Sequence, residues 1–295
     1  MPELQRPTPA AALKLRTPMA AATAAALLIA ALCFLQVGRA AAEHHGESAD
    51  AALTDAANGA HRSAQNIARN AARHPVETLS WFGIQPDMTV VEIWPGGGGW
   101  YTEVLAPYLR ERGKLVAANY AATPDREYYG RNAKKFRAKL AAQPEVYDRV
   151  TVTDLMPPDR LLAAEPGSAD MVLTFRNLHN WIRNGYPEAM FDAMYRVLKP
   201  GGVLGLVAHR GEPDMLGPEW AEKGYVPVSE ARRLAEEAGF RFVDSSEINA
   251  NPKDTKDHPE GVWTLPPGFR LKDVDRDKYA AIGESDRMTL KFVKP

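Results

Sequence analysis

Short apolar segments alternate with longer amphipathic ones from residue 87 to the C-terminus, and this alternation restricts the chain to few folds. The apolar segments are too short for typical helices, which indicates buried strands. The predicted strands cover residues 90–93, 115–118, 150–153, 171–175, 203–207, 240–243 and 288–293. The predicted helices cover residues 100–112, 126–142, 188–198 and 229–238. This order predicts an α/β fold with a doubly wound, mostly parallel seven-stranded sheet and helices on both faces.

Ligands of such sheets bind beyond the carboxyl ends of the strands. The loops that begin after Ile93, Ala118, Thr153, Phe175 and Ala208 should therefore border one crevice.

Four consecutive glycines, Gly96 to Gly99, follow the first predicted strand. Because glycine has no Cβ, such a run either lets the backbone approach a ligand or forms a tight structural turn. A dinucleotide site requires the spacing G-x-G-x-x-G. Counted from Gly96, the third glycine position is Tyr101, and counted from Gly97 it is Thr102. The spacing argues against a nicotinamide-dependent dehydrogenase.

An acidic residue, Glu92, ends the first strand and is followed by glycines at alternate positions, Gly96 and Gly98. Here the chain resembles the class I S-adenosylmethionine-dependent methyltransferases, whose first motif has this form. The resemblance continues through residues 153–155, 170–175 and 198–204 and extends from residue 76 to residue 295. It implies a Rossmann-like fold and S-adenosyl-L-methionine as the cofactor.

The chain also resembles a subgroup of exported predicted methyltransferases. These have a Trp-Pro-Gly-Gly-Gly loop, here residues 94–98, and an Asp-His-Pro-Glu-Gly-Val-Trp segment, here residues 257–263. Two positions depart from the general family pattern. Trp94 replaces the first glycine of the motif, and Asn119 replaces an acidic residue that accepts hydrogen bonds from the ribose. An amide accepts weaker hydrogen bonds than a carboxylate does.

The resemblance implies cofactor-binding roles for residues of several loops. Gly96 and Gly98 would line the methionine part, and Glu92 would hold the loop or bind the amino group. Asp154 would face the adenine amino group, or else cap a helix, a position that Asp favours. The other predicted cofactor-binding residues are Trp94, Asn119, Arg176 and Asn177.

His179 and His209 are the predicted catalytic residues. His179 follows the fourth strand, where family members place groups that face the reactive methyl, and His209 follows the fifth. An imidazole with a pKa of about 6.5 suits proton removal from a hydroxyl or amine acceptor. Alternatively, His179 packs against Trp181 without a chemical role, and His209 or Arg210 contacts an anionic acceptor.

The segment of residues 245–286, between the last two strands, is longer than the hairpin that often joins these strands in the family. We expect either a lid over the acceptor pocket or a surface excursion held by Trp263.

The first 42 residues have the pattern of a secretory signal peptide. Lys14 and Arg16 precede an uncharged apolar run over residues 19–37, and the small residues at 40–42 suit cleavage. The alternative is an uncleaved membrane anchor, because about 20 apolar residues span a bilayer. The predicted organisation is a signal peptide over 1–42, a flexible linker over 43–60 and a methyltransferase-like domain over 61–295. We therefore expect a periplasmic or secreted protein without stable membrane insertion after cleavage.

The composition excludes several other functions. Cys33 is the only cysteine and lies in the predicted signal peptide, so the body has no disulfide, thiolate nucleophile or cysteine-based zinc site. A net charge of −1 without a basic stripe favours no nucleic-acid partner. The remaining polar residues show no metal-ligand spacing.

These patterns predict an S-adenosylmethionine-dependent methyltransferase that acts on an unidentified small-molecule acceptor. The alternative is a non-catalytic periplasmic binding protein on a methyltransferase fold, because the cofactor is made in the cytoplasm and the signal directs the protein away from it.

Overall fold

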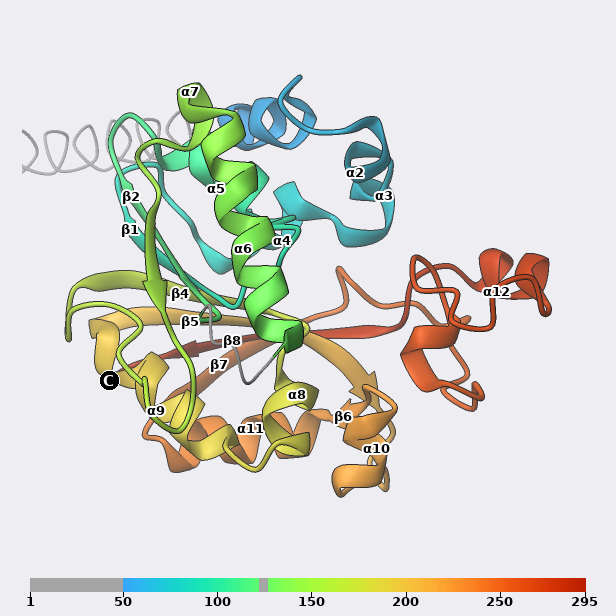
Figure 1. The fold of residues 1–295 in the computed structure, drawn as a ribbon. Helices are drawn as coiled ribbons and strands as arrows, with labels where there is room; N and C mark the ends of the chain where they lie inside the picture. The colour runs from blue at the N-terminus through green and yellow to red at the C-terminus, as the bar shows by residue number, and fades with distance from the viewer. Residues whose placement is uncertain (1–49, 122–126) are drawn as a thin grey trace, which may run out of the picture. The chain divides into compact units, whose positions relative to one another are not determined.

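The strands form one mixed, mostly parallel sheet, as predicted. The computed structural model describes residues 50–121 and 127–295, so the predicted signal peptide lies outside the described residues (Figure 1). The strand order is β3-β2-β1-β4-β5-β8-β7, with the two-residue β6 paired to β5. β8 is antiparallel to β5 and β7, and the other pairs are parallel. The bounds are β1 Thr89–Ile93, β2 Lys114–Asn119, β3 Thr151–Asp154, β4 Ala169–Phe175, β5 Leu198–Gly211, β6 Val226–Pro227, β7 Arg241–Ser246 and β8 Arg287–Val293.

The strand order changes direction at β1. β2 and β3 lie on one side of it, and β4 and β5 lie on the other. Val90 of β1 is therefore opposite Leu115 of β2 and Met171 of β4. At such a switch point the loops after the two central strands go to opposite faces, which leaves a crevice beyond their carboxyl ends. The glycine run begins at this crevice.

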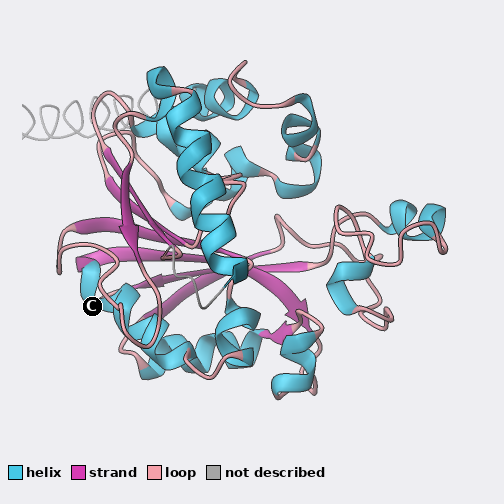
Figure 2. Cartoon of the chain, viewed as in Figure 1, coloured by secondary structure: helices cyan, strands magenta, loops and turns pink. Residues whose placement is uncertain are grey.

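Helices cover both faces of the sheet (Figure 2). α4 and α5 lie on one face, and α9 and α11 lie on the other (Figure 1). Within the described ranges, no helix has both the length and the apolar character needed to cross a bilayer. The bounds are α2 Ala64–Ala68, α3 Asn70–Arg73, α4 Pro75–Phe82, α5 Thr102–Leu109, α6 Glu127–Ala142, α7 Pro144–Tyr147, α8 Leu178–Arg183, α9 Pro187–Val197, α10 Pro218–Glu222, α11 Val228–Glu237, the 3-10 helix η1 Gly261–Thr264 and α12 Arg276–Ile282.

Neighbouring residues of one strand contribute to two different cores, because side chains of a strand alternate between its faces. Val90 packs in the core that contains Leu79 of α4. Val91 packs in the core that contains Met190 and Met194 of α9. These two methionines are fully buried, four residues apart on one face of the helix.

The second half of the predicted flexible linker is helical, so that prediction is wrong for residues 50–58. Leu53 is 1% exposed and packs in the same core as Leu79 and Phe82 of α4. The alanines of this segment are strong helix formers, and Ala56 and Ala57 are buried with Leu53. One apolar anchor in an alanine-rich segment is enough to order it on a neighbouring core.

Residues 247–286 form an excursion beyond the ends of β5 and β8 that contains η1 and α12 (Figure 1). The buried Asp254 carboxylate of this excursion forms hydrogen bonds that hold it to the rest of the domain. Tyr225 donates its hydroxyl to Oδ1 at 2.9 Å, and the Asp286 backbone N–H donates to Oδ2 at 2.8 Å. The His258 Nε2 lies 2.9 Å from Oδ1. Because these bonds converge on one buried group, the excursion is tied firmly to the sheet.

The Glu103 carboxylate of α5 joins three segments of the chain. It is 2% exposed and accepts a hydrogen bond from the Arg62 Nε at 3.0 Å. Asn66 of α2 donates to Oε1 at 2.9 Å, and Lys139 of α6 forms an ion pair with the same oxygen. The buried carboxylate therefore holds the N-terminal helices against α5 and α6.

We expect Glu103→Gln to lower the free energy of unfolding by about 3–5 kcal/mol, because it leaves the buried Arg62 guanidinium without its counter-charge. Urea unfolding followed by circular dichroism measures this change. Glu111→Gln is the matched control, because Glu111 is exposed and pairs with Arg110 at 3.8 Å. Equal stability of the two variants would contradict this role of Glu103.

Candidate functional site

The residues after the parallel strands meet at one edge of the sheet, as predicted. The Trp94 N–H donates to the Ala118 carbonyl at 2.8 Å, and the Arg176 N–H donates to the Val207 carbonyl at 2.7 Å. These bonds continue the pairing of neighbouring strands into their loops. His209 differs from expectation because β5 extends to Gly211 and places it within the strand.

The glycine run faces open space at alternate positions. A Cβ placed on Gly96 or Gly98 would have no atom within 4 Å, whereas one on Gly97 or Gly99 would collide with side chains of α6. Gly96 has φ 70°, in the left-handed region that glycine enters without strain. The predicted cofactor-binding glycines, Gly96 and Gly98, are thus the two at which a ligand can approach the backbone.

Glu92 lies beneath this loop and is 2% exposed. Thr102 at the start of α5 donates its hydroxyl to Glu92 Oε2 at 2.6 Å. Burial raises the pKa of Glu92 to about 7, although the Thr102 hydrogen bond and the charge of Arg176 oppose this shift. The carboxyl is therefore balanced between its two protonation states near neutral pH.

Trp94 fills the crevice on the side of β2 and β3. Its side chain is buried, and its indole Nε1 donates to the Leu155 carbonyl at 2.8 Å. The ring centroid lies 4.9 Å from that of Tyr120 and 6.2 Å from that of Trp181. Trp94 also has φ 49°, which explains why glycine is usual at this position of the motif. The indole is held in a conformation that its surroundings impose.

Asn119 and Asp154 are engaged by neighbouring parts of the chain. The Asn119 Nδ2 donates to the Gly96 carbonyl at 3.1 Å, and its Oδ1 accepts the Tyr120 N–H at 2.9 Å. Asp154 pairs with Arg137 at 2.9 Å and Arg160 at 2.8 Å. Asn119 therefore positions the glycine loop, and Asp154 is part of an exposed ion-pair cluster.

Asn177 and Arg176 follow β4 but point into different surroundings. Asn177 is buried, and its Nδ2 donates to the Ile93 carbonyl at 2.9 Å and to Thr174 Oγ1 at 3.2 Å. It therefore ties the end of β4 to the end of β1. Arg176 has φ 62° and lines a second cavity together with His209.

The two predicted catalytic histidines lie together, with ring centroids 5.4 Å apart. The ring of Trp263, from the excursion, lies 5.4 Å from His179 and 6.3 Å from His209. The His209 Nδ1 lies 2.6 Å from the Ser285 Oγ, whereas neither ring nitrogen of His179 has a partner among the described residues. Burial lowers the pKa of His179 to about 3 and that of His209 well below its usual value. Both imidazoles are therefore neutral at pH 7.

The fold is shared with known methyltransferases. A SAM-dependent methyltransferase from Aquifex aeolicus aligns with a TM-score of 0.51 and 16% identity, covering 77% of this chain and 93% of that one. A proposed sarcosine dimethylglycine methyltransferase from Galdieria sulphuraria aligns with a TM-score of 0.51 and 15% identity, covering 78% and 87%. No protein of curated function matches the sequence. Residues 96–206 match the family model described as a methyltransferase domain.

Over residues 96–206 the chain is similar to a methyltransferase domain. The matched family supports S-adenosylmethionine as the cofactor, as the sequence predicted. The open backbone at Gly96 and Gly98, together with the buried Glu92 at the end of β1, fits the amino-acid end of this cofactor. The Leu155 carbonyl, after β3, accepts the hydrogen bond of the Trp94 indole.

Several residues of the candidate site were missed from the sequence. Arg69 and Arg73 line the same second cavity as Arg176, and Glu284 and Ser285 reach it from the excursion. The spacing of the two N-terminal arginines was the available signal, because residues four apart share one face of a helix. Glu284 and Ser285 carried no local signal, since only the return of the excursion brings them to the sheet.

The stability of the folded protein should fall on acidification because of His179. An unfolded histidine takes up a proton as the pH falls through about 6.5, but the folded pKa of His179 is about 3. Between these values the unfolded state binds more protons, so the free energy of unfolding decreases by about 1.4 kcal/mol per pH unit. His179→Gln should remove this contribution.

Denaturant unfolding of the parent chain and His179→Gln between pH 5 and 8 tests this expectation. The difference between the two proteins is the measured quantity, because the raised pKa of Glu92 acts in the opposite direction in both. The difference should be constant above pH 7 and decrease below 6.5. A pH-independent difference would show that His179 titrates normally in the folded protein.

Proposed function

We propose that this protein transfers the methyl group of S-adenosylmethionine to a small-molecule acceptor. The observation that carries this proposal is the open glycine loop at the switch point of the sheet, where Gly96 and Gly98 expose backbone beside the buried Glu92. Loops at this position of doubly wound sheets are ligand sites. The match of residues 96–206 to a methyltransferase domain agrees with this reaction.

The bound cofactor supplies an electrophilic methyl group on a sulfonium. Gly96 and Gly98 would let the backbone approach its amino-acid part, and the Glu92 carboxylate would accept hydrogen bonds from the amino group. Asn119 and Asn177 act as positioning residues, because one holds the Gly96 carbonyl and the other the Ile93 carbonyl. Holding both reactants in line contributes most of the acceleration of such a transfer.

His209 is the better placed of the two histidines to accept a proton from a hydroxyl or amine acceptor. It lines the cavity that contains Arg176, and Ser285 holds its Nδ1. The ring is neutral at pH 7, but burial and the neighbouring charges lower its pKa well below 6.5, so it is a weaker base than the sequence predicted. His179 lies behind it at 1% exposure and has a supporting role. The family match gives no support to a purely non-catalytic binding protein.

Alanine substitutions of neighbouring glycines test the placement of the cofactor. Gly98→Ala adds a methyl group to the open side of the loop and should weaken binding of S-adenosylmethionine and S-adenosylhomocysteine by about tenfold or more, with Gly98→Val weaker still. Gly97→Ala is the matched control, because its methyl group meets the end of the flexible Asn132 side chain and not the open side of the loop. Isothermal calorimetry measures both affinities.

The melting temperature of Gly98→Ala should stay close to that of the parent, because nothing lies within 4 Å of the added atom. Absence of binding heat and of a thermal shift with either compound in the parent protein would refute the proposed function. Equal affinities of the two alanine variants would refute only the assignment of the glycine loop.

Export is part of the same proposal and rests on residues 14–42 of the sequence. Expression of the full chain in a bacterium, followed by fractionation and N-terminal sequencing, should give a periplasmic protein that begins after Ala40 or Ala42. An intact N-terminus in the membrane fraction would instead support the uncleaved anchor. An intact N-terminus in the cytoplasm would contradict export.

A further inference from the structure

A second cavity, of about 240 Å³, lies beside the carboxyl ends of β4 and β5. It is formed by parts of the chain that are far apart in sequence: the N-terminal helices, the loop after β4, the end of β5 and the excursion. The lining residues that carry the argument are Arg69, Arg73, Arg176, His209, Trp263 and Glu284.

Positive charge is in excess around this cavity. The Glu284 carboxylate accepts hydrogen bonds from Arg69 Nε at 2.7 Å, from Arg73 Nε at 3.1 Å and from Arg287 Nη1 at 3.2 Å. These neighbours lower the pKa of Glu284 to about 2, so it is ionised at neutral pH. Arg176 makes no hydrogen bond to Glu284 but lies within reach of its charge, so four guanidinium groups surround one carboxylate, an excess of three positive charges.

Nitrogen atoms of all four arginines are buried without a hydrogen-bond partner among the described residues. They are Arg69 Nη2, Arg73 Nη1, Arg176 Nη1 and Arg287 Nε. Arg73 is only 4% exposed, so water cannot solvate its guanidinium freely. A buried charged donor that lacks an acceptor costs free energy of folding. Four such donors in one cluster are not expected unless a ligand accepts their hydrogen bonds.

The arginines also repel one another. Burial lowers the pKa of Arg73 well below its usual value, and the charge of Arg176 adds to this shift. Burial and the charge of Arg287 lower the pKa of Arg176 to about 10, so the group is still protonated at pH 7. The fold therefore maintains a positive site at a cost in stability, a pattern typical of functional positions.

The opposite wall of the cavity is apolar. Val262 and Trp263 of η1 and the following Pro266 and Pro267 contribute this surface. A ligand with a flat or apolar body could contact the indole and the prolines while its charged end meets the guanidiniums. Arginine suits this role because it binds carboxylate and phosphate groups through paired N–H donors.

We propose that this cavity binds the anionic group of the methyl acceptor, a carboxylate or a phosphate, through Arg69, Arg73 and Arg176. The role as acceptor rests on the proposed function, whereas the anion site itself does not. The acceptor is then a small organic acid or phosphate ester whose apolar part lies against Trp263.

Calorimetry of the full-length chain with benzoate and inorganic phosphate tests the anion site, and benzamide serves as the neutral counterpart of benzoate. At least one of the two anions should bind to one site, and benzamide should bind about tenfold more weakly or not at all. Arg176→Gln should weaken anion binding by about tenfold or more. This variant is expected to fold, because the Arg176 side chain has no hydrogen bond to the described residues and its removal relieves repulsion.

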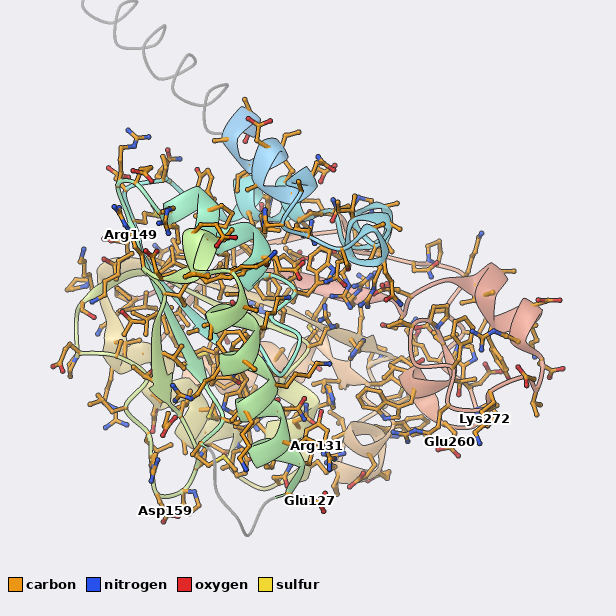
Figure 3. All side chains as sticks on the ribbon, turned by 45° about the horizontal axis from the view of Figure 1, so that its top comes forward. Glu127, Arg131, Arg149, Asp159, Glu260 and Lys272 are labelled. Atoms are coloured by element: carbon orange, nitrogen blue, oxygen red, sulfur yellow. The ribbon has the colours of Figure 1, made fainter. Side chains whose placement is uncertain are left out.

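Arg131→Gln is the control, because Arg131 is exposed on α6 beside Glu127 (Figure 3). Its anion affinity should equal that of the parent chain. If neither anion binds to the parent, or if Arg176→Gln binds them as tightly as the parent does, the cavity is not an anion site. Neither result affects the proposed function, which is tested separately by titration with S-adenosylhomocysteine.

A titration of the anion in the presence of saturating S-adenosylhomocysteine tests the acceptor role. An acceptor group should still bind, because it occupies the active site together with the cofactor. Competition between the two ligands would show that the arginines hold the carboxylate of the cofactor itself and would overturn the acceptor assignment. Anion binding in a protein that binds no S-adenosylhomocysteine would support the anion site and refute the proposed function alone.

Discussion

The position of β1 between β2 and β4 is the constraint on which the site depends. Because β1 pairs in parallel with both neighbours, their carboxyl ends meet at one edge while their loops diverge. The glycine run begins where this divergence leaves space. Asn119 of β2 and Asn177 after β4 then hold backbone carbonyls of the same turn from both sides. The open positions at Gly96 and Gly98 are thus a consequence of how three strands are ordered.

The second cavity, lined by Arg69, Arg73 and Arg176, shows a conflict between stability and function. The buried Glu103 carboxylate pairs with two cations, Arg62 and Lys139. Around Glu284 the excess of positive charge is larger, because three guanidiniums donate to one carboxylate, Arg176 lies nearby, and all four retain unpaired donors among the described residues. Buried charges with unpaired donors are expected at functional sites, where a bound ligand supplies the missing hydrogen-bond acceptors. The excursion completes this cavity with both Glu284 and Trp263, so it is part of the site.

Trp94 illustrates how a departure from a family pattern is accommodated. Its backbone has the left-handed conformation that glycine normally provides, and the indole is stabilised by the Leu155 carbonyl and by contact with Tyr120 and Trp181. The sequence showed that a bulky residue replaces glycine here. It did not show where the ring lies, because that depends on contacts with residues from the loops after β2 and β4.

The sequence by itself determined the alternation of strands and helices, the glycine run with its acidic neighbour, and the resemblance to class I methyltransferases. These are properties of short segments, since strand and helix periodicity and turn chemistry depend on nearby residues. The helix at residues 50–58 was missed because one buried leucine among alanines is a weak local pattern. Only the tertiary structure decided that Arg73, Arg176 and Glu284 surround one cavity and that the two histidines are neutral. Burial and charge neighbours are set by segments more than a hundred residues apart, and no local pattern in the chain encodes them.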